Sequence, residues 1–140
     1  MKKTNQNGFS LIELLLVITI IGIIASISLP YLKKAKSSAE NASMFSTMRT
    51  LTSAEIGFYT NNGRYATLSE IDAANPSKFG KLSGSNLIRG SFTLDMGSVT
   101  ATDPSLKTDF TVTATKTVDA SESPYQIAVS SNGRILQLAP

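Results

Sequence analysis

A long uncharged apolar segment near the N-terminus constrains this chain more than any other feature of its sequence. Residues 14–32 contain no charged side chain, and they approach the roughly 20 residues that a helix needs to cross the hydrocarbon core of a bilayer. Across the wider segment 9–32, 17 of 24 residues are hydrophobic, whereas the rest of the chain is rich in Ser, Thr and Gly. The sequence therefore predicts two chemically different parts, a membrane anchor and a water-facing head.

The same segment has two ingredients of a secretory signal peptide, because Lys2 and Lys3 precede an apolar core. A signal peptide also needs a cleavage site after that core, whereas helix-like sequence continues here through residues 29–32. Nor does a signal peptide account for the carboxylate of Glu13 inside the apolar block. A charge in hydrocarbon costs several kcal/mol, so an acid at this position indicates a function. A retained anchor is therefore favoured over a removed signal peptide.

The residue types that are absent exclude most catalytic and metal-binding classes. The sequence has no His and no Cys, which excludes imidazole bases, thiol nucleophiles, disulfides and the usual zinc and iron–sulfur ligand sets. Its 13 basic residues are balanced by 10 acidic ones, and they form no Arg-rich run. We expect no enzymatic activity, no cofactor and no direct binding of nucleic acid.

A short motif, GFSLIE at residues 8–13, lies between the basic leader and the apolar segment. Together with them it resembles the class III prepilin signal of type IV pilins and of the pseudopilins of type II secretion systems. The resemblance implies that a membrane-embedded aspartic peptidase cleaves after Gly8 and methylates Phe9, the new N-terminal residue. It also implies that Glu13 is the family's glutamate near the mature N-terminus, and that Pro30 is the family's helix proline.

Elementary chemistry explains why the motif needs these residue types. Gly8 has no side chain, so a peptidase can approach its backbone closely. Cleavage before the anchor keeps the anchor on the mature protein and creates an α-amine, whose reference pKa is about 7.7–8.0. Glu13 lies one helical turn from that amine and can pair with it within a subunit or between subunits. Pairing between subunits would fix their axial register, so Phe9 and Glu13 are predicted assembly residues. The resemblance adds Pro30 to them.

The predicted organisation has a leader peptide at 1–8, a transmembrane and filament-core helix at 9–32, and an amphipathic helix with a globular head at 33–140. Basic residues flank the anchor on both sides, so the positive-inside rule gives no orientation. The resemblance implies a single-pass precursor in the bacterial inner membrane with its head outside the cytoplasm, and later an extracellular pilus or periplasmic pseudopilus. Three lysines after the anchor fit contact with lipid headgroups or with acidic surfaces of neighbouring subunits: Lys33, Lys34 and Lys36.

Beyond Pro30 the apolar residues continue at helical spacing and change from small to bulky. They are Ala35, Ala39, Ala42, Phe45, Met48, Leu51, Ile56 and Tyr59. The small residues are expected to pack against other subunits and the bulky ones against the chain's own head. Gly63 provides a stop, so the sequence predicts one helix of about fifty residues, which Pro30 bends or loosens.

The C-terminal part predicts an α+β head. Residues 64–90 are expected to be a loop region with one short helix, which the capping box TLSE at 67–70 begins and Asn75-Pro76 ends. Four later segments alternate between apolar and polar residues, namely 91–96, 110–115, 125–130 and 134–138. They predict a four-stranded antiparallel sheet packed on the long helix, an arrangement that resembles the pilin head.

The last two predicted strands flank Asn132-Gly133, a pair that favours a two-residue type I′ turn. Such a turn would place Val129 opposite Leu136, with both side chains on the face that packs on the long helix. Ile127 would lie opposite Leu138 on the same face.

Two further features of the head bear on its resemblance to pilins and pseudopilins. Residues 59–65, YTNNGRY, resemble the aromatic–Asn-Gly–Tyr step after the long helix of many pilins and of the major pseudopilin, although Ala66 stands where the pseudopilin pattern usually has proline. Asp95, Asp103 and Asp109 fall around a loop where the major pseudopilin binds calcium, which makes them an alternative metal site. Solvated turn carboxylates are commoner, so we expect no metal.

The sequence predicts a structural subunit that is stored in the inner membrane and then polymerises into a type IV pilus through its N-terminal helix. The alternative is a pseudopilin of a type II secretion system. Expected partners are identical or related pilin subunits, the prepilin peptidase and methyltransferase, an inner-membrane assembly platform, and membrane lipid. An enzyme or binding domain that is tethered by a plain membrane anchor is the alternative from a different functional class. No group of catalytic residues in the sequence supports it.

Overall fold

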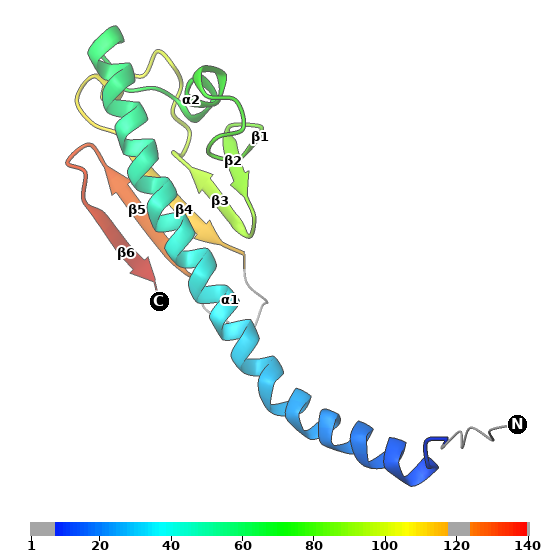
Figure 1. Ribbon diagram of the computed structural model, residues 1–140. Coiled ribbons are helices and arrows are strands. Elements are labelled where there is room, and N and C mark those ends of the chain that lie inside the picture. Colours follow the sequence, from blue (N-terminus) through cyan, green and yellow to red (C-terminus); the bar gives the residue numbers. More distant parts are fainter. Residues whose placement is uncertain (1–7, 118–123, 140) are drawn as a thin grey trace, which may run out of the picture. The chain divides into compact units, whose positions relative to one another are not determined.

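A computed structural model describes residues 8–117 and 124–139 of the chain. It contains two compact units, residues 1–39 and 40–140. Helix α1 (Leu11–Asn62) contributes its first part to the N-terminal unit and its second part to the head unit, which also holds helix α2 and the strands (Figure 1). Most of the predicted leader, residues 1–7, lies outside the described residues.

Helix α1 confirms the prediction of one long helix. It begins after Ser10, whose carbonyl accepts the N–H groups of Glu13 and Leu14 at 3.1 and 3.2 Å. Its 52 residues include Pro30, which lacks the N–H of a regular helical hydrogen bond. At the other end Gly63 adopts a φ of +68° and donates its N–H to the Tyr59 carbonyl at 2.8 Å. This left-handed residue ends the helix in the way that glycine permits at low cost.

The buried face of α1 differs from the predicted apolar stripe. Its buried residues are Met44, Thr47, Met48, Leu51, Thr52 and Glu55. Ile56 and Tyr59, which we expected in the core, are 51% and 39% exposed. The prediction was wrong here because it followed bulky side chains and ignored polar ones. Thr47 and Thr52 can be buried since each hydroxyl donates to the carbonyl four residues earlier.

Helix α2 (Leu68–Ala74) confirms the predicted capping box. The Thr67 hydroxyl accepts the Glu70 N–H, and the Glu70 carboxylate accepts the Thr67 N–H. Asn75 is the C-cap, followed by the proline that cannot continue the helix. Two apolar side chains of this short helix, Leu68 and Ile71, are buried in the core of the head.

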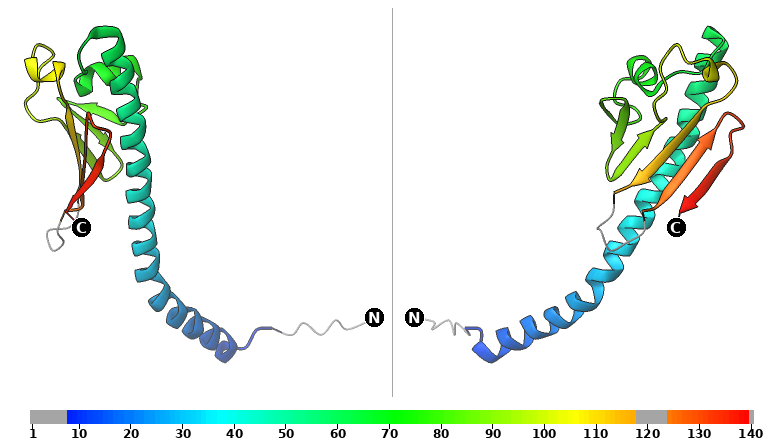
Figure 2. Two further views of the ribbon diagram at one scale, coloured as in Figure 1. Left: turned by 90° about the vertical axis from the view of Figure 1, so that its left-hand side faces the viewer. Right: turned by 180° about the vertical axis from the view of Figure 1, so that it is seen from behind.

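Six strands form one antiparallel sheet in which each strand pairs with its neighbours in sequence. They are β1 (Lys81–Ser83), β2 (Asn86–Arg89), β3 (Phe92–Asp95), β4 (Thr111–Lys116), β5 (Gln126–Ser130) and β6 (Ile135–Ala139). A short 3-10 helix, Pro104–Lys107, lies between β3 and β4. The sheet stands as a layer beside the second part of α1 (Figure 2), and the core lies between them.

The α+β class is confirmed, but the prediction of four strands was wrong. Strands β1 and β2 fall in the region expected to be a loop, where the glycines were taken only as breaks. Gly84 and Gly90 instead occupy the first position of two-residue hairpin turns, with φ values of +63° and +61°. A positive φ at that position is the requirement of a type II′ turn, which glycine meets at no steric cost.

The last hairpin exists, but its predicted register was wrong by one residue. Val129 pairs with Ile135, and Ala128 pairs with Leu136. The loop has three residues rather than two, since Gly133 donates its N–H to the Ser130 carbonyl at 2.9 Å and only Gly133 of the Asn-Gly pair has a positive φ. A shift of one residue moves side chains to the opposite face. Leu136 and Leu138 are consequently exposed.

Gly80 gives a direct test of the head's packing. It has a φ of +152°, and a Cβ built there would lie 2.6 Å from the Ile88 carbonyl oxygen. We expect Gly80→Ala to lower the free energy of unfolding by roughly 2–4 kcal/mol, because the backbone of β2 must move. The control is Gly57→Ala, at which a Cβ meets nothing within 4 Å. It should stabilise α1 by about 0.5–1 kcal/mol. Thermal unfolding of the full chain in detergent measures both, and equal effects would contradict the packing argument.

Candidate assembly segment

The predicted processing motif lies at the start of α1. Gly8, Phe9 and Ser10 precede the helix, and Glu13 lies in its first turn. A carboxylate there is favoured by the partial positive charge of the unpaired N–H groups at a helix N-terminus. The motif therefore consists of a tripeptide without regular secondary structure that leads into a helix whose first turn is acidic.

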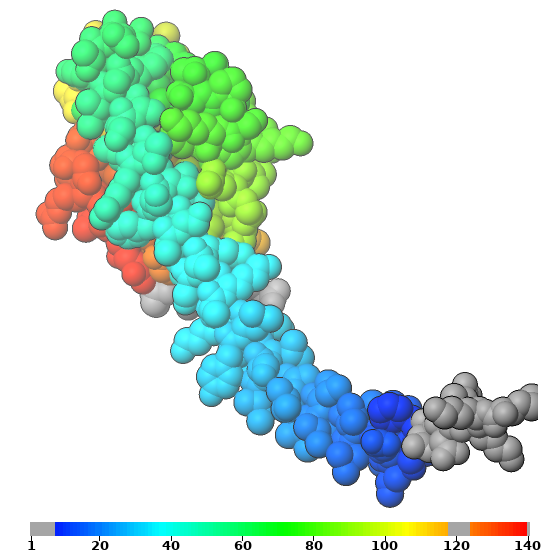
Figure 3. Space-filling view, viewed as in Figure 1, coloured from blue at the N-terminus to red at the C-terminus, as the bar shows by residue number. Residues whose placement is uncertain are grey.

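The helix after the motif presents apolar side chains all around its axis. Every described residue from 8 to 39 is exposed within the chain, including the bulky Ile and Leu side chains of the anchor. This segment is coloured blue to cyan in the space-filling view (Figure 3). Among the described residues, α1 is a helix long and apolar enough to cross a membrane by length and composition. An exposed apolar surface of this extent needs lipid or protein to cover it.

The polar side chains of the anchor bond to their own helix. Thr19 Oγ1 donates to the Leu15 carbonyl at 2.7 Å. Ser26 and Ser28 donate in the same manner to carbonyls three and four residues earlier, at 2.8 and 2.9 Å. An apolar surrounding therefore does not leave these hydroxyl groups unsatisfied.

Gly8 is not required by the fold. Its φ is not in the left-handed region, and a Cβ added to it would meet nothing within 4 Å. The same space is open at Gly22, inside the anchor. Packing among the described residues therefore gives no reason for glycine at position 8.

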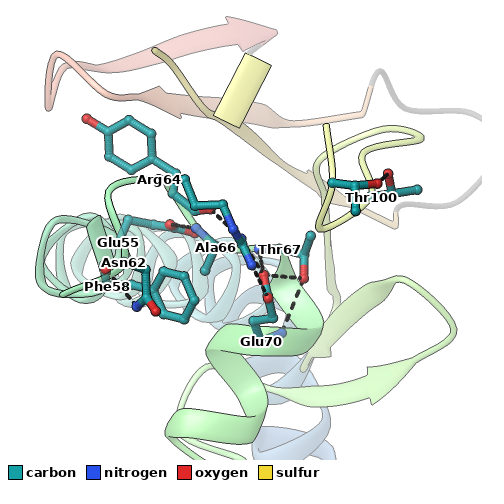
Figure 4. A network of polar contacts seen from close by, with 10 residues as sticks. Glu55, Phe58, Asn62, Arg64, Ala66, Thr67, Glu70 and Thr100 are labelled. Atoms are coloured by element: carbon teal, nitrogen blue, oxygen red, sulfur yellow. Dashed lines mark hydrogen bonds and ion pairs between the residues drawn. The ribbon is translucent and has the colours of Figure 1, made fainter. Parts of the chain in front are cut away.

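A polar network secures the loop between α1 and α2 in the head (Figure 4). Arg64 forms a two-pronged ion pair with Glu70, at 2.9 and 2.6 Å, and also donates to the Tyr65 carbonyl. This pair lowers the pKa of Glu70 to about 2, principally through the hydrogen bonds from Arg64. The Tyr65 ring stacks between Tyr59 and Phe110, at centroid distances of 4.7 and 4.8 Å.

Glu55 is the residue of this region that sequence reasoning missed. Its side chain is 0% exposed, and its Oε2 accepts the Ala66 N–H at 2.8 Å, whereas its Oε1 has no partner within the described protein. Burial raises the pKa of Glu55 to about 7, against the opposing effect of the Ala66 hydrogen bond. A proline at position 66, as in the pseudopilin pattern, would remove that hydrogen bond because proline has no N–H. Alanine at position 66, where the pseudopilin pattern has proline, therefore allows the hydrogen bond to Glu55.

The three aspartates of the alternative metal site serve separate turns. The Asp95 side chain accepts the Gly97 N–H, and that of Asp103 accepts the Ser105 N–H at the start of the 3-10 helix. Asp109 accepts the N–H groups of Phe110 and Ser131. Within residues 8–117 and 124–139, no group of three or more His, Cys, Asp or Glu side chains is placed to hold a metal ion.

The comparisons with known proteins give one family match at the N-terminus and relatives that share one name. Residues 3–29 match the family described as the prokaryotic N-terminal methylation motif. The type II secretion system core protein G of Klebsiella michiganensis is 36% identical over 70 residues, which are 50% of this chain and 49% of that protein. The protein of the same name from Aeromonas hydrophila is 36% identical over 74 residues, 52% of each chain.

The chain thus spans about half the length of the curated relatives it matches. No solved structure matches it significantly. The matched family covers Gly8, Phe9 and Glu13 but stops one residue before Pro30. Processing at Gly8 and the roles of Phe9, Glu13 and Pro30 in assembly remain predictions.

Proposed function

We propose that this chain, whose methylation motif and homology to core protein G support the type IV pilin and pseudopilin family, is a structural subunit of a helical filament. Its N-terminal helix would anchor the precursor in the membrane and would then pack with other subunits. The family consists of structural subunits, which agrees with the absence of His and Cys from the sequence.

One observation carries this proposal, the fully exposed apolar helix that follows the motif. Lipid covers such a helix in the precursor, and helices of neighbouring subunits cover it in a filament. Repetition of one head-to-tail contact between identical subunits builds a filament when the rotation between them does not close a ring. In the apolar interior of that filament, the α-amine of Phe9 on one subunit would pair with Glu13 on another and so fix the step between subunits.

The two kinds of filament are favoured by different observations. Both curated relatives carry the name of a type II secretion protein, which favours a secretion pseudopilus. Ala66, in place of the usual proline of the major pseudopilin, favours a type IV pilus, and here its N–H is bonded to Glu55. Recovery of the chain in filaments sheared from the cell surface would identify a pilus. Retention in the periplasm, with loss of a secreted protein when the gene is deleted, would identify a pseudopilus.

The processing step provides the direct test. Mass spectrometry of the chain from membranes is expected to give an N-terminal peptide that begins with N-methylated Phe9. Replacement of Gly8 by Val should leave the chain in the membrane with its leader attached, because a branched side chain blocks close approach to the backbone. An N-terminus at Met1 in the wild type, or one beyond Ala25, would exclude the proposed function.

A further inference from the structure

A buried lysine ties the sheet to the helix at the beginning of the head unit. Lys116 is the last residue of β4, and 8% of its side chain is exposed. Its Nζ lies 2.9 Å from Glu40 Oε2 and donates to Asn41 Oδ1 at 3.3 Å. These partners are consecutive residues on α1, and Asn41 is 75 positions away from Lys116 in the sequence.

Two aromatic rings and a serine hydroxyl surround these three side chains. The Phe92 ring lies 5.6 Å from Lys116 Nζ, and the Tyr125 ring meets Phe92 edge-on at 6.2 Å. Ser91 Oγ donates to Glu40 Oε2 at 3.0 Å, which fixes the carboxylate beside the lysine. An amine, a carboxamide and a carboxylate are thus held together at a site where the lysine is buried and the other two side chains are half-buried.

We propose that Lys116 and Asn41 join in an intramolecular isopeptide bond, with Glu40 as the catalytic acid and base. Glu40 takes a proton from the Lys116 ammonium group, and the free amine attacks the Asn41 side-chain carbonyl carbon. The C–N bond to the Asn41 amide nitrogen breaks as the protonated Glu40 returns its proton to that nitrogen, which leaves as ammonia. Glu40 then takes the surplus proton from the attacking Lys116 nitrogen, so that the products are the new amide, ammonia and a protonated Glu40 carboxyl group. One amide replaces another, so the step needs no oxidant, nucleotide or metal.

The distances allow this reaction after a small adjustment. Because Oδ1 is bonded to the carbonyl carbon at about 1.23 Å, Lys116 Nζ lies no more than about 4.5 Å from that carbon. Reacting atoms meet at about 3–3.5 Å, so a rotation of the Asn41 amide by its own side-chain torsions supplies the difference. Proton exchange between Lys116 Nζ and Glu40 Oε2 can follow the short contact of 2.9 Å between them.

Such a bond would close a long loop of the chain. It would join α1 covalently to the inner part of the sheet, across most of the head, in a protein whose sequence contains no cysteine. Constraining the unfolded chain in this way stabilises the native state for the same reason that a disulfide does. The inference does not depend on which filament the subunit builds.

Peptide mass spectrometry of the full chain tests the bond. Trypsin should give one branched peptide in which residues 37–49 are joined to residues 108–134, since a modified Lys116 is no longer cleaved. The intact chain should be lighter by one ammonia molecule than its sequence requires, after allowance for N-terminal processing. Separate linear peptides 37–49 and 108–116 at full mass would overturn the proposal. Loss of ammonia from Asn41 without a branched peptide would overturn it as well, since that marks cyclisation onto the backbone.

Matched variants separate the chemistry from a merely structural ion pair. Lys116→Arg keeps the charge beside Glu40 but has no amine to react, so the branched peptide should disappear while circular dichroism stays unchanged. Asn41→Ala should have the same effect, and Glu40→Gln should strongly reduce the yield. Lys107→Arg, at an exposed lysine, is the control and should retain the bond. A full yield of branched peptide in Glu40→Gln would overturn the role of Glu40.

Discussion

Replacement of Glu13 by Gln is expected to abolish incorporation into filaments while leaving membrane insertion and cleavage intact. The substitution preserves the shape of the side chain and the helix but removes its charge. In a filament, the α-amine of a neighbouring subunit would then be buried without a counter-charge, at a cost of about 3–5 kcal/mol for each contact. This corresponds to a fall of more than about a hundredfold in the affinity of that contact.

The measurement is the fraction of processed chain found in filaments, either sheared from cells or recovered from the periplasm. Thr19→Val is a matched control in the same helix, because the Thr19 hydroxyl donates to the Leu15 carbonyl of its own helix and carries no charge. It should be incorporated like the wild type. Wild-type incorporation of the Glu13→Gln variant would contradict the pairing of Glu13 with an α-amine and would favour a plain membrane anchor.

The stability of the head is expected to fall as the pH rises from about 5 to 8. The pKa of Glu55 is raised by burial from 4.5 to about 7. Below pH 4.5 the carboxyl is protonated in both the folded and unfolded states, so it imposes no penalty. As the pH rises through 4.5 and then 7, the unfolded state ionises first, and the penalty is complete above pH 7. Its size is roughly 3 kcal/mol in the free energy of unfolding.

Ionisation of Glu70 changes the free energy of unfolding in the opposite direction, at lower pH. Its pKa is lowered from 4.5 to about 2 by Arg64, so its contribution is present above pH 4.5 and is lost as the pH falls through 2. Partial exposure reduces that contribution to about 1–2 kcal/mol. Together, the two glutamates predict greatest stability close to pH 4.5, the ordinary value for both.

Denaturant unfolding of the full chain in detergent between pH 3 and 8 would measure this profile. The Glu55→Gln variant keeps an oxygen for the Ala66 N–H but cannot ionise, so its stability should be nearly constant from pH 5 to 8. Glu70→Gln is the paired control, which should keep the loss above pH 5 and weaken the loss near pH 3. A wild-type stability that rises between pH 5 and 8 would show that Glu55 ionises without penalty.

The features that sequence predicted well depend on local patterns. The capping box at Thr67 and Glu70 specifies the start of α2 through bonds three residues apart. Gly63 ends α1 because the left-handed conformation suits glycine. The N-terminal methylation motif could also be found in this way, since its glycine, its acid and its apolar run follow one another directly.

The features that sequence missed depend on contacts between distant residues or on fine turn geometry. Glu55 is polar, and only the Ala66 N–H, contributed by a later loop, makes its burial tolerable. A single additional residue in the β5–β6 loop reversed the faces of Leu136 and Leu138. The group around Lys116 brings together α1 and β4, for which neither local sequence contains a signal.

The hydroxyl groups of Thr19, Ser26 and Ser28, which bond to their own helix, have a consequence for the proposed transfer of the anchor from membrane to filament. Polar groups that rely on their surroundings must exchange partners whenever a helix moves from one solvent to another. These three hydroxyl groups keep their hydrogen bonds to the same helix wherever the helix lies. Lipid tails and packed protein are therefore nearly equivalent surroundings for this part of the anchor. The two apolar phases should therefore differ little in energy for it, and an assembly machine would have to work mainly against Glu13 and the flanking charges.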